Sequence, residues 1–442
     1  MKNIASLVII FGAAIIWYYT HSEYSMSIYI MLAIMLWLYM AINIWANDVA
    51  NSVWPAVWSK TISLKWAIVI AAIWNASWAM IGGWEVVKTI KKWIINIDWF
   101  GWEPQLFIFA MLASLLAAAL WLNIATFFRA PVSTTHSIVG WVMWAWIAAL
   151  GISVVSWSTV WKIAASWVIS PLLWWIIAAI FLLWIKKTIL FQKDMVKSAK
   201  RWVPFFLAIM TWAFTTYLIV KWVKNLIKID FTKASIIWLI IAIIIYFISK
   251  YRLSKTTKIK NNRESVNLLF TIPLIAAVGL LTFAHWANDV ANAIWPIAAI
   301  YDAVINWTVA WKVEIPFWIL AMWGLWISLW LSFYWPRIIS TVWSEITELD
   351  RIRAFSIALA ASLTVILASQ LWLPVSSTHI ALGWVFWVWF LREWLDRKTR
   401  DKCEKYVKRE LIKKIVSAWL ITLPVVAFIS WGIYLLLVTF VK

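Results

Sequence analysis

Apolar stretches of about 20 residues follow one another along almost the whole chain, and they limit the possible folds more than any other feature. About 20 helical residues are needed to cross the hydrocarbon core of a bilayer. Of the 442 residues, 65% are hydrophobic and 13% charged, whereas soluble domains carry about 25% charged residues. We predict an all-α integral membrane protein with about twelve transmembrane helices, at residues 4–19, 26–45, 65–82, 105–128, 138–155, 161–185, 203–222, 234–249, 266–285, 316–334, 353–373 and 414–440, and a shorter apolar piece at 380–391.

The distribution of charge argues against a nucleic-acid partner, although the net charge is +20. Lys and Arg concentrate between the apolar stretches, in the segments 186–201, 250–263 and 397–414. Under the positive-inside rule such loops face the cytoplasm. Placing all three on one side requires at least one apolar piece to be a re-entrant hairpin. The pattern predicts a multi-pass protein of the cytoplasmic membrane whose surroundings are the lipid bilayer.

Two motifs recur in the same order, which indicates an internal duplication. Residues 45–55 (Trp-Ala-Asn-Asp-Val-Ala-Asn-Ser-Val-Trp-Pro) recur 241 residues later at 286–296, as Trp-Ala-Asn-Asp-Val-Ala-Asn-Ala-Ile-Trp-Pro. Residues 131–136 (Pro-Val-Ser-Thr-Thr-His) recur 243 residues later at 374–379, as Pro-Val-Ser-Ser-Thr-His. Unrelated motifs with nearly the same offset indicate two homologous halves.

The duplication divides the chain into three parts. We assign residues 1–185 to the first repeat half, 186–265 to intervening helices and a basic cytoplasmic linker, and 266–442 to the second repeat half. About seven apolar crossings separate the two copies of the first motif, and an odd number places the halves in opposite orientations. The sequence therefore predicts two inverted repeats.

The first motif carries a polar cluster at Asn47, Asp48 and Asn51, which share one helix face because they lie three or four residues apart. They follow an apolar run, where a carboxylate is costly and by default marks an ion or substrate path. Carboxylate and amide oxygens suit an alkali or alkaline-earth cation. Simple polar contact between helices is the alternative, but it does not explain why aspartate recurs. The second copy has Asn288, Asp289 and Asn292.

A proline closes each copy of this motif, at Pro55 and Pro296. Proline removes a backbone donor and breaks or kinks a helix. Broken helices are tolerated in a membrane mainly where they line a site, so we expect a helix break or kink at both positions.

The second motif has the composition of a helix start, because proline favours the first helical position and Ser or Thr the cap. Free backbone N–H groups and the positive end of the helix dipole would form an anion site inside the bilayer. Neutral hydroxyl donors suit an oxyanion that must also be released. The alternative is that these hydroxyls only bond back to their own helix. The hydroxyls are those of Ser133, Thr134, Thr135, Ser376, Ser377 and Thr378.

Four further titratable residues lie at places where they could line an ion path. His136 and His379 close the two copies of the second motif and suit a metal ligand, a proton carrier or, more commonly, a hydrogen-bonding support. Glu85 and Glu345 follow apolar spans in similar contexts. For these two, a solvated helix end is the alternative.

The balance of tryptophan and glycine is abnormal, with 43 Trp and only 10 Gly. Membrane helices normally favour Gly, and Trp gathers at the two interfaces. Here Trp interrupts runs of small residues at 140–146 and 383–389, and Trp84 follows two glycines. We interpret many tryptophans as replacements of glycines in a parent sequence. Overpacking costs about 1–3 kcal/mol per site against a net stability of about 5–15 kcal/mol. This interpretation predicts that the chain as written is inactive.

In these motifs the sequence resembles the inorganic phosphate transporter family. The family hallmark is a duplicated Gly-Ala-Asn-Asp-Val-Ala-Asn-Ala motif, with Pro-Val-Ser-(Ser/Thr)-Thr-His later in each half. Both motifs occur here twice and in order, and the resemblance covers essentially the whole chain. The leading glycine of the hallmark is Trp45 and Trp286 here, and the glycine before each closing proline is Trp54 and Trp295.

The resemblance implies a twelve-span, inverted-repeat symporter that moves inorganic phosphate with sodium ions and forms a homodimer. Phosphate would bind between the two hydroxyl-bearing tips, and each sodium ion would neutralise charge that the anion brings. The implied phosphate ligands are Ser133, Thr134, Thr135, Ser376, Ser377, Thr378, Asn47 and Asn288. The implied sodium ligands are Asp48, Asn51, Asp289 and Asn292.

Other functions stay open at this point. A divalent-metal transporter would use Asp48, Asp289, His136 and His379 as ligands, and a phosphate carrier could be coupled to protons or a metal instead of sodium. An enzyme is not expected, because the sequence contains no His-Glu-x-x-His, no Gly-x-Ser-x-Gly and no phosphate-binding glycine loop.

Overall fold

The computed structural model describes residues 27–74, 103–128, 130, 132–218, 231–256, 259–309, 313, 315–333, 349–370, 376, 378–379, 393 and 409–441. Regular structure in these residues consists of helices, and no β-strand occurs among them. The all-α prediction is confirmed. The first apolar stretch, the short piece at 380–391, Glu85, Glu345 and Ser377 lie outside the described residues.

The helices of the first half follow the predicted apolar stretches closely. The short segments η2 (Ile152–Val154) and η3 (Lys186–Leu190) precede and follow the helix at Trp157–Ile185. The helices are α2 (Ser27–Trp58), a short helix Leu64–Trp74, α4 (Pro104–Phe127), α5 (Thr134–Leu150) and α6 (Trp157–Ile185).

The remainder of the chain adds two intervening helices and the helices of the second half. They are α7 (Met195–Leu218), α9 (Phe231–Ser254), α10 (Arg263–Leu269), α11 (Thr271–Asn306), α12 (Phe317–Phe333), α14 (Arg351–Gln370) and α16 (Arg409–Val441). Phe270 separates α10 from α11, and the chain bends by 46° between α10 and the first part of α11, Thr271–His285.

Four helices of the described part are long and apolar enough to cross a membrane, or five if the bent pair formed by α10 and α11 is one span. They lie at Pro104–Phe127, Trp157–Leu190, Ile236–Ser254 and Ile415–Phe440. Shorter apolar helices lie at Ile28–Ile44, Leu64–Trp74, Ile294–Asn306 and Phe317–Trp326. The chain is thus a multi-pass helical protein, and the figure of twelve spans stays a prediction.

Neither proline of the duplicated motif breaks its helix, so the expected helix break is wrong. α2 continues past Pro55 to Trp58, and α11 continues past Pro296 to Asn306. A proline withdraws only one backbone donor, so the other hydrogen bonds of each helix can continue past it. Pro55 and Pro296 are themselves buried.

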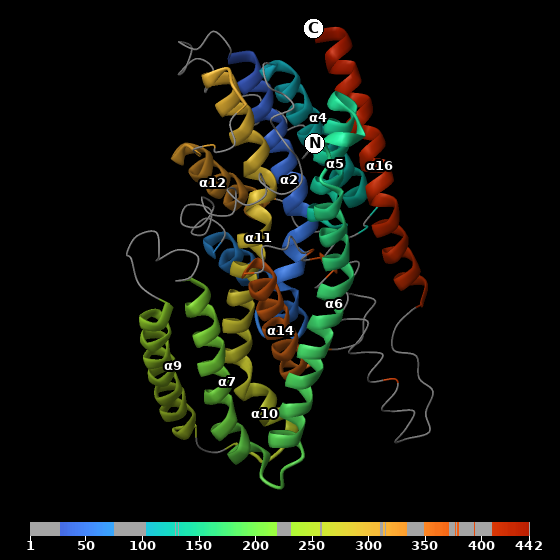
Figure 1. Cartoon of the computed structure of the whole chain (residues 1–442). Helices are drawn as coiled ribbons and strands as arrows, with labels where there is room; N and C mark the ends of the chain where they lie inside the picture. The colour runs from blue at the N-terminus through green and yellow to red at the C-terminus, as the bar shows by residue number, and fades with distance from the viewer. Residues whose placement is uncertain are drawn as a thin grey trace.

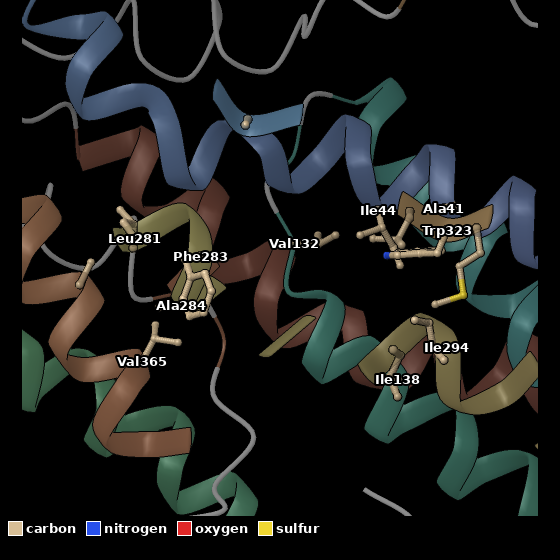
Figure 2. Packing of buried hydrophobic residues seen from close by; sticks show 14 of the residues in the cluster. Ala41, Ile44, Val132, Ile138, Leu281, Phe283, Ala284, Ile294, Trp323 and Val365 are labelled. Carbon is tan, nitrogen blue, oxygen red and sulfur yellow. The ribbon is translucent and has the colours of Figure 1, made fainter. Parts of the chain in front are cut away.

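The core lies where helices of both halves meet. Figure 1 shows α2, α4, α5 and α11 grouped in the middle of the molecule, with α16 along one edge. Figure 2 shows buried side chains of α2, α5 and α11, among them Ile44, Ile138 and Ile294, gathered in one region of the core. Of the apolar window in α4, 78% is buried by protein.

α9 is the least buried of these apolar helices and packs against α7 at the periphery (Figure 1). Only 6% of its apolar window is buried. Long aliphatic side chains such as Ile236, Ile240 and Ile244 are exposed along it. In a membrane protein, a helix that is apolar all round with so little burial faces lipid.

Candidate functional site

The first polar tip is the start of α5, which the second motif predicted. α5 begins at Thr134, and the Ser133 hydroxyl accepts a hydrogen bond from the His136 backbone N–H at 3.1 Å. A serine at this position satisfies one of the backbone donors that every helix start leaves without an intrahelical acceptor. All hydroxyls of the tip are buried, so a helix N-terminus with its free donors lies inside the protein.

The second tip has the same local structure. The Ser376 hydroxyl accepts from the His379 backbone N–H at 3.0 Å, and Thr378 and His379 are helical. The sequence prediction of two equivalent helix starts is confirmed at these residues. Because the same cap forms 243 positions apart, the two tips are structural counterparts.

The polar cluster of α2 meets the second tip, which belongs to the other half of the sequence. The Asn51 side-chain amide donates to Thr378 Oγ1 at 2.9 Å and to Asp48 Oδ1 at 3.1 Å. Thr378 Oγ1 lies 3.1 Å from Asp48 Oδ1, to which it can donate. Asp48 and Thr378 are fully buried. Residues 330 positions apart therefore form one polar group in the core.

The same hydroxyl connects the two tips. Thr378 Oγ1 also lies 3.2 Å from the backbone carbonyl oxygen of Val132, the residue that precedes the Ser133 cap. A hydroxyl carries one hydrogen, so Thr378 donates at any moment either to Asp48 or to Val132. The second tip is thus bonded to α2 and, in alternation, to the first tip.

Other predicted site residues cannot be placed as side chains. Asn47 lies in α2, and Asn288, Asp289 and Asn292 lie in α11, but only their helical backbone is described. α2 packs against α11, so the two copies of the first motif lie on neighbouring helices. Ser377, Glu85 and Glu345 lie outside the described residues.

The two histidines touch each other across the two tips. The rings of His136 and His379 meet edge to face, with centroids 4.1 Å apart. Each ring also stacks on a tryptophan, His136 on Trp167 of α6 at 3.6 Å and His379 on Trp419 of α16 at 3.7 Å. The four rings form a continuous row, here called the ring row, that joins the two halves.

Sequence reasoning missed Trp167 and Trp419 because it treated the tryptophans as one abnormal set. A signal was present in the residues that follow them. Trp167 begins Trp-Val-Ile-Ser-Pro and Trp419 begins Trp-Leu-Ile-Thr-Leu-Pro, so each is followed by a hydroxyl residue and a proline. This is a third motif shared by the two halves.

Several polar atoms at the tips have no partner among the described residues. These are Thr134 Oγ1 and the Nε2 atoms of His136 and His379, all in buried side chains. A buried polar atom that makes no hydrogen bond is costly, and a bound ligand is one explanation for it. Together with the helix starts, they offer neutral donors to an anion.

The groups around Asp48 suit a different ligand. Its carboxylate, the Asn51 carbonyl oxygen and the Thr378 hydroxyl are hard oxygen donors of the kind that bind alkali cations. The described residues contain no group of three or more His, Cys, Asp or Glu side chains able to hold a metal ion. The groups at the tips thus suit an anion and those around Asp48 suit a cation, and Thr378 links the two sets through its contacts with Asp48 and Val132.

Comparisons with known proteins agree with these motifs. A family model described as the phosphate transporter family matches residues 44–430. Proteins named "Putative phosphate permease" are similar to the chain. The one of Helicobacter pylori (strain J99) is 41% identical, covering 97% of this chain and 94% of its own length. The one of Thermococcus kodakarensis is 34% identical, covering 92% and 97%.

A solved structure is similar to the whole fold. It is titled "The sodium-dependent phosphate transporter" and is 32% identical to this chain, with a TM-score of 0.84. The likeness covers 93% of this chain and 99% of that one. The segment that the family model matches includes both copies of each motif.

Proposed function

Because the chain belongs to the phosphate transporter family, we propose that it carries inorganic phosphate across the membrane by symport with sodium ions. The similar sodium-dependent structure supports sodium as the coupling ion. On this proposal, phosphate binds between the two tips, and sodium binds at the polar cluster of α2 and at its counterpart on α11.

The contact between Asp48 and Thr378 is the observation that carries the proposal. It joins a carboxylate suited to sodium directly to a helix start suited to phosphate. A buried carboxylate and a phosphate in one dry site repel each other unless cations lie between them. Sodium at Asp48 removes that repulsion, so each ligand makes the binding of the other more favourable.

The donors of the tips favour release as well as binding. Serine, threonine and backbone groups form hydrogen bonds to an oxyanion without adding a fixed positive charge. Phosphate is therefore held mainly while sodium is present. Loss of sodium on the low-sodium side of the membrane then weakens the hold on phosphate, and both ligands leave.

The duplicated motifs support a matching architecture. We propose twelve spans in two inverted repeats, formed by residues 1–185 and 266–442 and joined by residues 186–265. The basic loops would face the cytoplasm under the positive-inside rule, which places the protein in the cytoplasmic membrane. We further propose that it works as a homodimer, as the family resemblance implies.

Proton coupling is a second candidate, and the ring row favours it. His136 and His379 touch, and their Nε2 atoms have no partner among the described residues. Histidine is the usual carrier of protons near neutral pH. In this alternative a proton accompanies phosphate in place of a sodium ion.

Uptake of labelled phosphate into proteoliposomes tests both candidates. The assay compares an inward sodium gradient, a potassium gradient and a proton gradient without sodium. It is run on the chain as written and on a variant with glycine at Trp45, Trp54, Trp141, Trp286, Trp295 and Trp384, here called the six-glycine form. Uptake that needs sodium supports symport with sodium, and uptake driven by protons alone overturns it.

A pair of matched variants makes the assay specific. Asp48→Asn in the six-glycine form keeps the size of the side chain but removes the charge, and we expect it to abolish sodium-dependent uptake. Asp302→Asn makes the same change near the end of α11, where the carboxylate accepts from Asn306, and should leave uptake intact. Stabilisation of the protein by Mn²⁺ or Zn²⁺ without phosphate would instead favour a divalent-metal transporter.

A further inference from the structure

The tryptophans of this chain do not form one class. Average glycine usage of about 7% would give about 31 glycines in a chain of this length, but there are 10, alongside 43 tryptophans. By that measure about 21 glycines are missing, while tryptophan is more than four times as common as glycine. The surroundings of individual tryptophans separate those that the fold uses from those that occupy places suited to glycine.

Trp141 lies where three helices cross closely. Ser430 of α16 donates to its backbone carbonyl oxygen at 2.9 Å, and Ser114 of α4 approaches the same oxygen at 3.5 Å. At the neighbouring Gly140, an added Cβ would lie 3.3 Å from Leu423 Cδ2. Close crossings of membrane helices use small residues. Trp141 instead puts a fully buried indole there, and its N–H has no partner among the described residues.

Trp54 and Trp295 occupy equivalent places in the two halves. Each is buried and directly precedes the proline inside its helix. The indole N–H of Trp295 has no partner in the part of the chain that the structure describes. The indole N–H of Trp167 is also without a partner among the described residues, so this feature alone does not separate the two classes. The place of Trp295 directly before a proline inside a buried helix does.

Trp167 and Trp419 differ from these tryptophans, because the fold uses their rings. Each stacks on the histidine of its own tip, and the two contacts match in distance, 3.6 and 3.7 Å, and in interplanar angle, 33°. Glycine at either position would end the ring row and leave one face of a buried imidazole without contacts. These two residues hold the histidines in place.

We propose that the native protein has glycine at six positions, because the cell translates as glycine one of the codons that stand for tryptophan in the printed sequence. The six positions are Trp45, Trp54, Trp141, Trp286, Trp295 and Trp384. Trp141 and Trp295 are assigned from their surroundings, and Trp54 is the repeat counterpart of Trp295. Trp384 is the repeat counterpart of Trp141, and Trp45 and Trp286 begin the two copies of the first motif.

Reassignment of a codon explains why tryptophan stands in place of glycine and not the reverse. It also explains why so many positions are affected. UGA is a stop codon in the standard code and is reassigned in other codes, and it differs from the glycine codon GGA only in its first base. A single reassigned codon converts all its positions at once, whereas independent mutations would not gather at places suited to glycine. The proposal does not rest on the proposed transport activity.

The codons of the gene and the mass of its peptides test the proposal directly. The tryptophan codons are sorted into UGG and UGA, and the protein is purified from its native cells for tandem mass spectrometry. We expect UGA and glycine at positions 54, 141 and 295, and UGG and tryptophan at 167 and 419. Tryptophan in the native peptides at 54, 141 and 295 overturns the proposal. Glycine at 167 or 419 overturns the distinction between the two classes.

Two variants test the same distinction through stability. In detergent and without phosphate, the six-glycine form should unfold at a higher temperature than the chain as written. A form with Trp167→Gly and Trp419→Gly should unfold at a lower temperature. No gain for the six-glycine form contradicts the proposal. A six-glycine form that is more stable but carries no phosphate contradicts the proposed function and leaves the glycine assignment intact.

Discussion

At the scale of single residues, Thr378 has the most consequential position in the described site. Its hydroxyl accepts from Asn51 and has two acceptors, Asp48 and the Val132 carbonyl, for its one hydrogen. A sodium ion at Asp48 would occupy lone pairs of the carboxylate. The hydroxyl would then donate to Val132 instead, which strengthens the bond between the two tips when sodium is bound.

Replacing Thr378 by valine tests this role, because valine has the same shape and no hydroxyl. The change leaves Asn51 and the Val132 carbonyl with one partner fewer, and an unsatisfied buried group costs about 1–3 kcal/mol. We expect a loss of stability of that size and a smaller stabilisation by sodium. Thermal unfolding of the six-glycine form in sodium and in potassium measures both effects.

Two further variants control this experiment. Thr378→Ser keeps the hydroxyl and should restore the response to sodium. Thr364→Val makes the same substitution at a buried position of α14, where the hydroxyl has no partner among the described residues, and should cost little. An unchanged response to sodium in Thr378→Val would show that the hydroxyl has no part in cation binding.

At the scale of helices, sequence reasoning succeeded where local chemistry decides the structure. A serine cap and the residues after it are close in sequence, so the starts of both tips could be predicted from the second motif. The continuation of α2 and α11 past Pro55 and Pro296 could not. Proline removes only one backbone donor, and the residues next to it do not reveal whether the helix continues.

Removing the caps tests whether the helix starts bind the anion. Ser133→Ala and Ser376→Ala should each cost about 1 kcal/mol of stability, a typical value for a lost cap, and should also lower the affinity for phosphate. Isothermal titration of the six-glycine form with phosphate in sodium measures that affinity.

Asn262→Ala is the matched control for the caps. The Asn262 side chain caps α10 by accepting from the Ser265 backbone N–H at 2.9 Å, and α10 carries none of the predicted ligands. Its removal should cost similar stability and leave phosphate binding unchanged. If the two serine variants bind phosphate as tightly as Asn262→Ala does, the tips are helix starts without a role in binding.

At the scale of the whole molecule, the duplicated motifs predicted two homologous halves, and only the family resemblance implied that their tips meet. Asp48 of the first half meets Thr378 of the second, so the polar group that the structure describes is composed of residues from both halves. The ring row is a second connection of this kind. Both depend on the approach of segments more than 240 residues apart, which no local pattern specifies.

A composite site predicts reciprocal binding. If sodium raises the affinity for phosphate by some factor, phosphate must raise the affinity for sodium by the same factor. Couplings of this kind commonly amount to about 5–150-fold. Titration of the six-glycine form with each ligand, in the presence and absence of the other, gives both factors. Phosphate binding with the same affinity in sodium and in potassium would exclude the coupling proposed here.

The burial of α4 has a consequence for the biosynthesis of the protein. α4 packs against α2, α5 and α11, and also against α16, which ends at Val441. A ribosome makes α4 long before α16, so this early span enters the bilayer while one of its neighbours does not yet exist. Lipid or an insertion factor must cover that face of α4 until α16 has been made. The Ser430 bond to the Trp141 carbonyl therefore forms only after that.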